Sequence, residues 1–222
     1  MCVVTTHIRY SSLIVTIFAV ALASLDLVID PSRPIPPRVQ DFLADASARV
    51  EAFIDSTLDD PVAGFVPSNY PMVYRALEAV RDHAAGKEFC EWGSGLGVIA
   101  CMASMLGFDA VGIEIEPRLV AESASLARDH QLNVQFVRGS YVPDGDVPEQ
   151  ESDEAHVMRL EPGRAAYEEL GLDVDDFDCI FAYPWPGEDD VVTNIFKRHA
   201  ARGAVLVTYH GQDGLLVRRK VR

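Results

Sequence analysis

The residues best suited to chemistry lie in a short glycine-rich segment that follows an acidic side chain. Glu91 stands two positions before three alternating glycines, and Ser94 lies among them; the glycines are Gly93, Gly95 and Gly97. Glycine lets the backbone turn sharply and lets a ligand come close, because it has no Cβ. A carboxylate at this place repels a pyrophosphate but accepts a cation. The segment therefore predicts a site for a positively charged ligand.

Two elements must hold this segment. Residues 87–90 predict a strand and residues 98–106 predict a helix, which together make the opening half of a nucleotide-binding βαβ unit. A dinucleotide loop needs glycine at its first, third and sixth positions, and the sixth position from Gly93 is Val98. A nicotinamide-dependent reductase is therefore the less favoured enzyme. A tight turn without any ligand is a further alternative.

A second acidic residue closes the next predicted strand. Glu114 follows the apolar residues 108–113 and lies about 20 residues past the glycines, the spacing at which an acidic side chain takes ribose hydroxyls. Ile115 stands beside it. We expect Glu116 to cap or open a helix that begins at Pro117. A solvated carboxylate at a strand end is the alternative interpretation of Glu114.

Glu91, the three glycines and Glu114 together resemble motif I and the next acidic strand end of the class I, Rossmann-like methyltransferases, which use S-adenosylmethionine. The resemblance implies that Glu91 binds the amino-acid end of this cofactor, directly or through water, and that Glu114 and Ile115 lie at its ribose. The family often has an acidic residue after the third strand to contact adenine. Here Ser140 and Tyr141 stand instead, as hydrogen-bond and stacking partners of the base or as a plain turn.

A rigid aromatic loop follows a fourth buried strand at residues 179–182. It is similar to the Asp/Asn-Pro-Pro-Tyr/Trp loop of enzymes that methylate planar amino nitrogens, although Tyr183 replaces the polar residue and Trp185 the second proline. Prolines fix the backbone, and the rings either shape an acceptor pocket near the sulfonium or pack in the core. The predicted catalytic residues are Tyr183, Pro184, Trp185 and Glu188, with His210 as a further candidate base.

A loop and a helix precede the glycine segment. The loop contains Phe65 and Pro67, and residues 73–80 have the periodicity of an amphipathic helix, with Ser68 or Asn69 as its N-cap. Over residues 65–120 the layout resembles the small Dot1-like lysine methyltransferases. That resemblance implies a lid over the cofactor, to which Phe65 and Pro67 contribute.

These elements predict an α/β fold: a doubly wound, mostly parallel sheet with a C-terminal antiparallel strand, in an α/β/α sandwich with an N-terminal helical extension. The extension includes an amphipathic helix over residues 37–58. Residues 203–209 and 215–221 predict two strands that pair antiparallel across the turn at 211–214. A full family member usually has another helix before its last hairpin, and no segment of the sequence supplies it.

Three regions are expected along the 222 residues. Residues 1–30 form an apolar N-terminal segment, residues 31–84 a linker and helical extension, and residues 85–222 the cofactor-binding methyltransferase domain. Within this domain, an acidic surface loop is expected at residues 144–154 and a short helix at 165–171.

The apolar stretch at residues 13–23 has the parts of a secretory signal, including a small-x-small ending at Ala23. It is short for a membrane span. Three interpretations stay open: an uncleaved anchor, a start codon assigned too far upstream, and an apolar element packed on the domain. We expect a cytoplasmic domain, with membrane contact through residues 11–29 as an option.

The formal charge of −15, from 34 acidic and 19 basic residues, opposes nucleic acid as the acceptor, because its backbone would be repelled. Arg218, Arg219, Lys220 and Arg222 form the one basic cluster of the tail. The cysteines show no metal-ligand spacing, so no metal site is expected. We therefore expect an S-adenosylmethionine-dependent methyltransferase that acts on a small molecule or a protein. A non-catalytic, methyltransferase-like binding module is the competing interpretation, and the oligomeric state stays open.

Overall fold

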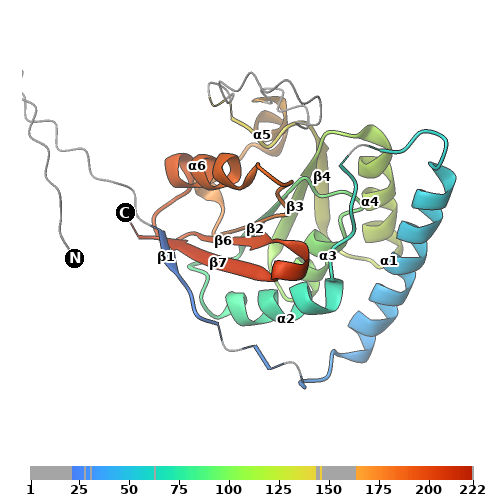
Figure 1. Cartoon of the computed structure of the whole chain (residues 1–222), viewed down its shortest axis with the longest axis horizontal. Helices are drawn as coiled ribbons and strands as arrows, with labels where there is room; N and C mark the ends of the chain where they lie inside the picture. Colours follow the sequence, from blue (N-terminus) through green and yellow to red (C-terminus); the bar gives the residue numbers. More distant parts are fainter. Residues whose placement is uncertain are drawn as a thin grey trace, which may run out of the picture.

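The computed structural model describes residues 22–27, 29–30, 32–62, 64–143, 146 and 164–221. They form a seven-stranded sheet of order β1-β7-β6-β5-β2-β3-β4, with helices on both faces (Figure 1). Six strands run in one direction and β7 runs against them. The predicted α/β/α sandwich with a mostly parallel sheet is therefore confirmed.

Five neighbouring strands of the sheet are parallel: β2 (Glu88–Trp92), β3 (Asp109–Glu114), β4 (Val134–Arg138), β5 (Cys179–Ala182) and β6 (Val205–Tyr209). β5 and most of β6 are apolar because both faces of a parallel sheet are covered. In β2 the side chains alternate between two cores: Phe89 packs in one, and Cys90 and Trp92 in the other.

Four helices share the first core: α1 (Pro37–Ser56), α2 (Tyr70–Arg81), α3 (Val98–Met105) and α4 (Pro117–Asp129). The second core holds α5 (Arg164–Leu170), α6 (Asp189–His199) and the short turn η1 (Val174–Asp176). The predicted loop at residues 144–154 lies, apart from Asp146, outside the described residues.

The N-terminal extension packs directly on the sheet domain. Phe42 of α1 and Leu77 of α2 are fully buried in the same cluster as Phe89 of β2. Arg49 of α1 adds polar contacts, because it bonds Asp45 on its own helix at 2.9 Å and Asp129 of α4 at 2.8 Å. The division of the chain at residue 84 stays a prediction.

The two C-terminal strands pair as predicted. β7 (Leu215–Lys220) follows β6 after the short turn η2 (Gly211–Asp213) and runs antiparallel to it, with Thr208 opposite Leu216. Beyond β7 the sheet has one more strand, β1 (Leu22–Ser24), which the sequence does not predict. The edge of the sheet next to β7 is thus formed by a strand from the N-terminal side of the chain.

The prediction of membrane contact through residues 11–29 is wrong. Within the described ranges, no helix has both the length and the apolar character needed to cross a bilayer. Leu22–Ser24 form β1 instead, and the Leu25 N–H donates to Val217 O at 2.9 Å. Leu22 and Leu25 pack against the two cores, so these residues behave as an apolar element of the domain. Residues 11–21 lie outside the described residues.

Removing β1 is expected to weaken the fold. A protein without residues 1–24 loses the strand that pairs with β7, and its free energy of unfolding should fall by about 1–2 kcal/mol, the net worth of a few backbone hydrogen bonds. The matched control lacks residues 1–20 and keeps β1. Urea unfolding of both proteins measures the difference, and equal stabilities would contradict a structural role for β1.

Candidate functional site

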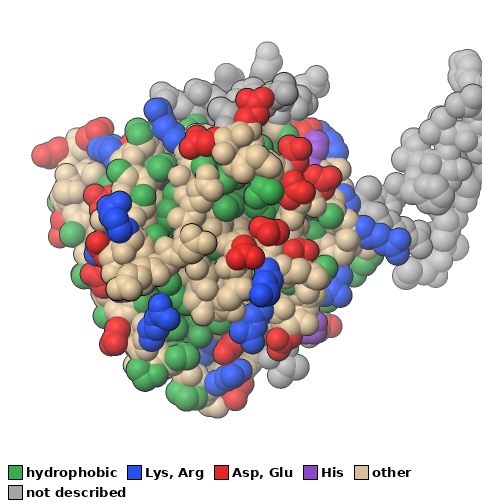
Figure 2. Space-filling view, turned by 180° about the vertical axis from the view of Figure 1, so that it is seen from behind, with side chains coloured by type: hydrophobic (Ala, Val, Ile, Leu, Met, Phe, Trp, Pro, Cys, Tyr) green, Lys and Arg blue, Asp and Glu red, His purple; other side chains and the backbone are tan. Residues whose placement is uncertain are grey.

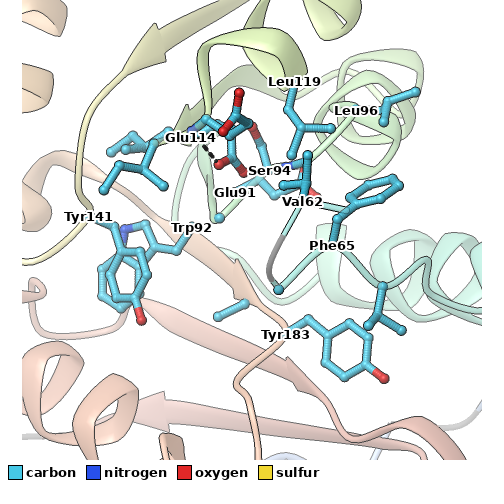
Figure 3. Close-up of a pocket in the computed structure, with 18 of the residues that line it drawn as sticks. Val62, Phe65, Glu91, Trp92, Ser94, Leu96, Glu114, Leu119, Tyr141 and Tyr183 are labelled. Atoms are coloured by element: carbon cyan, nitrogen blue, oxygen red, sulfur yellow. Dashed lines mark hydrogen bonds between the residues drawn. The ribbon is translucent and has the colours of Figure 1, made fainter. Parts of the chain in front are cut away.

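A cavity of about 1250 Å³ opens at the carboxyl ends of β2, β3, β4 and β5 (Figure 3). Parallel strands end at one edge of the sheet, so residues far apart in sequence meet there. Most of the predicted site residues line it: Phe65, Glu91, Gly93, Ser94, Gly95, Glu114, Ile115, Ser140, Tyr141, Tyr183, Pro184, Trp185 and Glu188. Gly97 and Pro67 are not among the lining residues.

The glycine turn between β2 and α3 has a backbone that favours glycine. Gly93, Gly95 and Gly97 have φ values of +68°, +54° and +69°, a region that other residues enter at a cost. Gly97 is the N-cap of α3. A Cβ on Gly95 would meet the Phe65 ring at 3.1 Å, so the loop before α2 lies directly over the turn.

Glu91 is buried beneath the glycine turn, with 4% of its surface exposed. Its Oε2 accepts a hydrogen bond from the Ala100 N–H at 2.8 Å, and this bond ties β2 to the first turn of α3. Burial raises the pKa of the Glu91 carboxyl well above its usual value; the Ala100 N–H opposes the rise and the charge of Glu114 adds to it. A cation in the cavity would favour the ionised form.

Glu114 holds the other side of the turn. Its Oε2 accepts from the Gly95 N–H at 2.8 Å, and its Oε1 accepts from the Glu116 N–H at 2.9 Å. Burial raises the pKa of Glu114, while these N–H groups oppose the rise. A carboxylate can accept about four hydrogen bonds, so Glu114 keeps capacity for ligand hydroxyls. Glu116 caps α4 through the Arg118 N–H at 3.2 Å, as predicted.

Ser94 offers a buried hydroxyl without a protein partner. It is 4% exposed, lines the cavity, and its Oγ has no hydrogen bond to any residue in the described part of the chain. A buried hydroxyl without a partner is unfavourable. A ligand that lies against the turn would supply one, so the residues present fit a polar ligand there.

The described residues of the loop, 59–62 and 64–69, close over the cavity and are held from three sides. The Phe65 ring packs edge-to-face on Phe53 with the centroids 5.4 Å apart. Trp185 donates from Nε1 to Gly64 O at 3.3 Å. Asp60 and Arg118 form an exposed ion pair at 3.5 Å. These contacts place Phe65 as a lid over the turn; Pro67 is exposed and lies outside the cavity lining.

Ser140 and Tyr141 lie at the end of β4 in a turn that uses their polar groups. The Ser140 Oγ accepts from the Val142 N–H at 3.1 Å. The Tyr141 ring stacks on Trp92, with centroids 5.1 Å apart and planes inclined by 10° (Figure 3). Contact of either residue with a base stays a prediction.

The side chains of the aromatic loop after β5 lie in different environments. Tyr183 packs edge-to-face on Tyr209 at 4.8 Å and points away from Glu91 and Ser94 (Figure 3). Glu188 is 6% exposed, and its Oε2 accepts from the Trp185 N–H at 3.3 Å. His210 does not line the cavity; it contacts Asp189 at 3.1 Å and Thr208 at 2.8 Å.

Several residues that line the cavity were not predicted from the sequence. Asp60 reaches the cavity from a loop, Tyr70 and Arg118 from the starts of α2 and α4, and Arg138 from the end of β4. Tyr70 carried the one available signal, since it stands next to the predicted cap of α2. Burial raises its pKa and the charge of Glu91 adds to the rise, which places the two side chains close together.

The basic cluster near the C-terminus is used within the fold. Lys220 is buried and donates to Ala200 O, Arg219 donates to His83 O, and Arg218 contacts Thr208 Oγ1 at 3.4 Å. On the face seen in Figure 2, Lys and Arg side chains are interspersed with acidic ones. These three residues therefore do not form a free basic patch.

Comparison with known proteins gives similarity at the level of structure. No family model matches the chain, and no curated protein matches it in sequence. A methyltransferase from Geobacter sulfurreducens is similar with a TM-score of 0.51 and 14% identity, over 86% of this chain and 93% of that one. An SAH-bound methyltransferase from Podospora anserina has a TM-score of 0.50 and 13% identity, over 80% and 63%.

An RNA methyltransferase from Salinibacter ruber, in complex with S-adenosyl-L-homocysteine, shares 22% identity over 70% of this chain and 92% of that one, with a TM-score of 0.49. The narrower resemblance to Dot1-like enzymes stays a prediction. The sheet order, the glycine turn after β2 and the similarity to the Geobacter and Podospora proteins show that the chain has the fold of the class I methyltransferases.

Proposed function

We propose that this protein is a methyltransferase that uses S-adenosylmethionine. The observation that carries the proposal is the pair of buried carboxylates, Glu91 and Glu114, which hold the glycine turn from both sides at the edge of one large cavity. Two buried acids suit a ligand that brings positive charge to one of them and hydroxyls to the other. S-adenosylmethionine has both features.

The residues present fit this cofactor. Glu91 would hold its ammonium group, Glu114 and Ile115 its ribose, and the Ser94 hydroxyl would gain the partner that it lacks among the described residues. When bound, the cofactor supplies a methyl group on a positively charged sulfur. Phe65 and the loop around it would exclude water from above the turn.

The acceptor binds, in this proposal, beside the loop that follows β5. Pro184, Trp185 and Glu188 line the cavity there, whereas the Tyr183 ring packs on Tyr209 and is less suited to chemistry. Catalysis would then depend mainly on the positioning of acceptor and donor in line. A small molecule or the side chain of a protein is the acceptor.

Isothermal titration calorimetry tests whether the protein binds the proposed methyl donor. We expect saturable, one-to-one binding of both S-adenosylmethionine and S-adenosylhomocysteine to the full chain. A protein that is folded by circular dichroism and binds neither compound would sink the proposal. The SAH-bound state of the Podospora protein is consistent with it.

A non-catalytic binding module is the second candidate, and the Ser140 turn favours it. The hydroxyl that stands where the family often has an adenine-binding acid is used by the Val142 N–H. Incubation with methyl-labelled donor and fractionated cell extract separates the two. Labelled product excludes the module, while tight cofactor binding without any labelled product supports it.

A further inference from the structure

The backbone of the glycine turn has few hydrogen-bond donors left for a ligand. Each N–H group donates one proton. Of the five N–H groups at residues 93–97, four donate within the protein: Gly93 and Ser94 to Ile113 O at 2.9 and 3.0 Å, Gly95 to Glu114 Oε2 at 2.8 Å, and Gly97 to Ser94 O at 2.7 Å. An anionic group that lies against this turn must therefore find most of its donors on side chains.

The cationic side chains of the described cavity lining are engaged elsewhere. Arg118, at the start of α4, pairs with Glu116 at 3.1 Å and with Asp60 at 3.5 Å. Arg138 ends β4, and its Nε donates to a backbone carbonyl at 3.4 Å. Because β3 lies between β4 and β2, Arg138 is also one strand away from Glu91 of β2. An anion beside Glu91 would therefore depend on uncharged donors.

Two hydroxyl groups are placed to act as such donors. The Ser94 hydroxyl is enclosed at the glycine turn and has no hydrogen bond to another described residue. Tyr70, the first residue of α2, lines the same cavity, packs partly on the first core and likewise makes no hydrogen bond to a described residue. Burial raises the pKa of Tyr70 and the nearby charge of Glu91 adds to the rise, so the phenol keeps the proton that it can donate.

Uncharged donors suit the amino-acid end of the proposed cofactor. This end carries an ammonium and a carboxylate on one carbon, so a ligand whose ammonium is held by Glu91 brings its carboxylate close to the same side chain. An arginine at this place would pair with Glu91 and weaken its attraction for the ammonium. A hydroxyl can donate to the carboxylate and leaves the charge of Glu91 unpaired.

Resting on the proposed function, we infer that Tyr70, together with Ser94, binds the carboxylate of the methyl donor, and that these hydroxyls make the protein select a donor with a complete amino-acid end. Decarboxylated S-adenosylmethionine is the ligand that isolates this contact. It keeps the ammonium and the sulfonium for Glu91 and the ribose for Glu114. It lacks only the group that the two hydroxyls bind.

Calorimetry on the full chain compares the two compounds. We expect the wild type to bind S-adenosylmethionine about tenfold more tightly than the decarboxylated compound, the worth of a hydrogen bond to a charged group. Tyr70→Phe removes the hydroxyl and keeps the ring that packs on the first core. It should weaken S-adenosylmethionine about tenfold and leave the decarboxylated compound unchanged. Ser94→Ala should shift the two affinities in the same way.

Tyr74→Phe is the matched control, because Tyr74 lies one turn further along α2 and is buried outside the cavity lining. Its loss of a hydroxyl should change neither affinity. Thermal unfolding shows whether Tyr70→Phe is folded, and Ser94→Ala carries the same comparison if it is not.

An equal loss for both compounds in Tyr70→Phe would assign this residue a packing role and overturn the inference. An unchanged affinity for S-adenosylmethionine in that variant would also overturn it, as would a wild type that binds both compounds equally well. A folded wild type that binds neither S-adenosylmethionine nor S-adenosylhomocysteine contradicts the proposed function and the inference with it. A wild type that binds both, without these differences, contradicts the inference alone.

Discussion

Replacing Gly97 with alanine is expected to lower the free energy of unfolding by about 3 kcal/mol and to abolish cofactor binding. Gly97 has φ +69°, and a Cβ there would lie 2.8 Å from the Ser123 Cβ and closer still to the Phe136 ring. The left-handed conformation costs about 1–2 kcal/mol for alanine, and overpacking a well-filled site costs about 1–3 kcal/mol more. Ser123 is fully buried in α4, so the backbone itself must move.

Gly93→Ala is the matched control, because Gly93 has φ +68° and a Cβ at this position would meet nothing within 4 Å. Only the conformational cost applies in Gly93→Ala, so the free energy of unfolding of this variant should fall by about 1 kcal/mol. Urea unfolding of both variants isolates the steric part. If the two substitutions are equally destabilising, the close approach of α4 to the glycine turn is wrong.

Replacing Glu91 with glutamine is expected to weaken S-adenosylmethionine binding by ten- to a hundredfold, since a charge-assisted contact is worth about 1.5–3 kcal/mol. The glutamine oxygen can still accept from the Ala100 N–H, so the first turn of α3 stays anchored. Calorimetry measures the affinity. Unchanged binding would contradict the role of Glu91, and Glu122→Gln serves as the control with the same change outside the cavity.

The pH dependence gives this prediction a second readout. The pKa of Glu91 is raised in the folded protein, so the folded state holds its proton more tightly than the unfolded chain. Stability without ligand should therefore fall as pH rises from the ordinary carboxylate range to the raised pKa of Glu91. Over the same window, binding of the cationic cofactor should strengthen and release a proton, which calorimetry in buffers of different ionisation enthalpy detects.

Glutamine at position 91 removes this titration. The pH dependence of stability and the pH dependence of cofactor binding should therefore both flatten. Glu114 also has a raised pKa and faces the same turn, and it supplies the residual slope in the variant. An equal slope in wild type and variant would assign the titration to Glu114.

The fold was predictable where local pattern determines the structure. β5 and β6 are short, mostly apolar runs because they are buried on both faces, and α4 begins at Pro117 behind the Glu116 cap. β1 was not predictable, because three residues carry no periodicity and its pairing partner lies at the other end of the chain. The residues of β1 lie within residues 11–29, whose apolar character suggested contact with a membrane instead.

The candidate site was likewise predictable only where local sequence determines it. Glu91, the glycines and Glu114 stand in a recognisable spacing, and the structure brings them to one cavity. The contact of Trp185 Nε1 with Gly64 O joins residues 121 positions apart and has no local signature. The orientation of Tyr183 toward Tyr209 likewise depends on the packing of two strands and not on the sequence of the loop.

The pairing of β1 with β7 also sets an order of events during synthesis. Leu22 is made early, yet its partner Lys220 is about 200 residues away, so the ribosome must finish nearly the whole described chain before the two can meet. The central parallel strands can assemble before that. The outer edge of the sheet is therefore closed last, and β1 waits unpaired until β7 emerges.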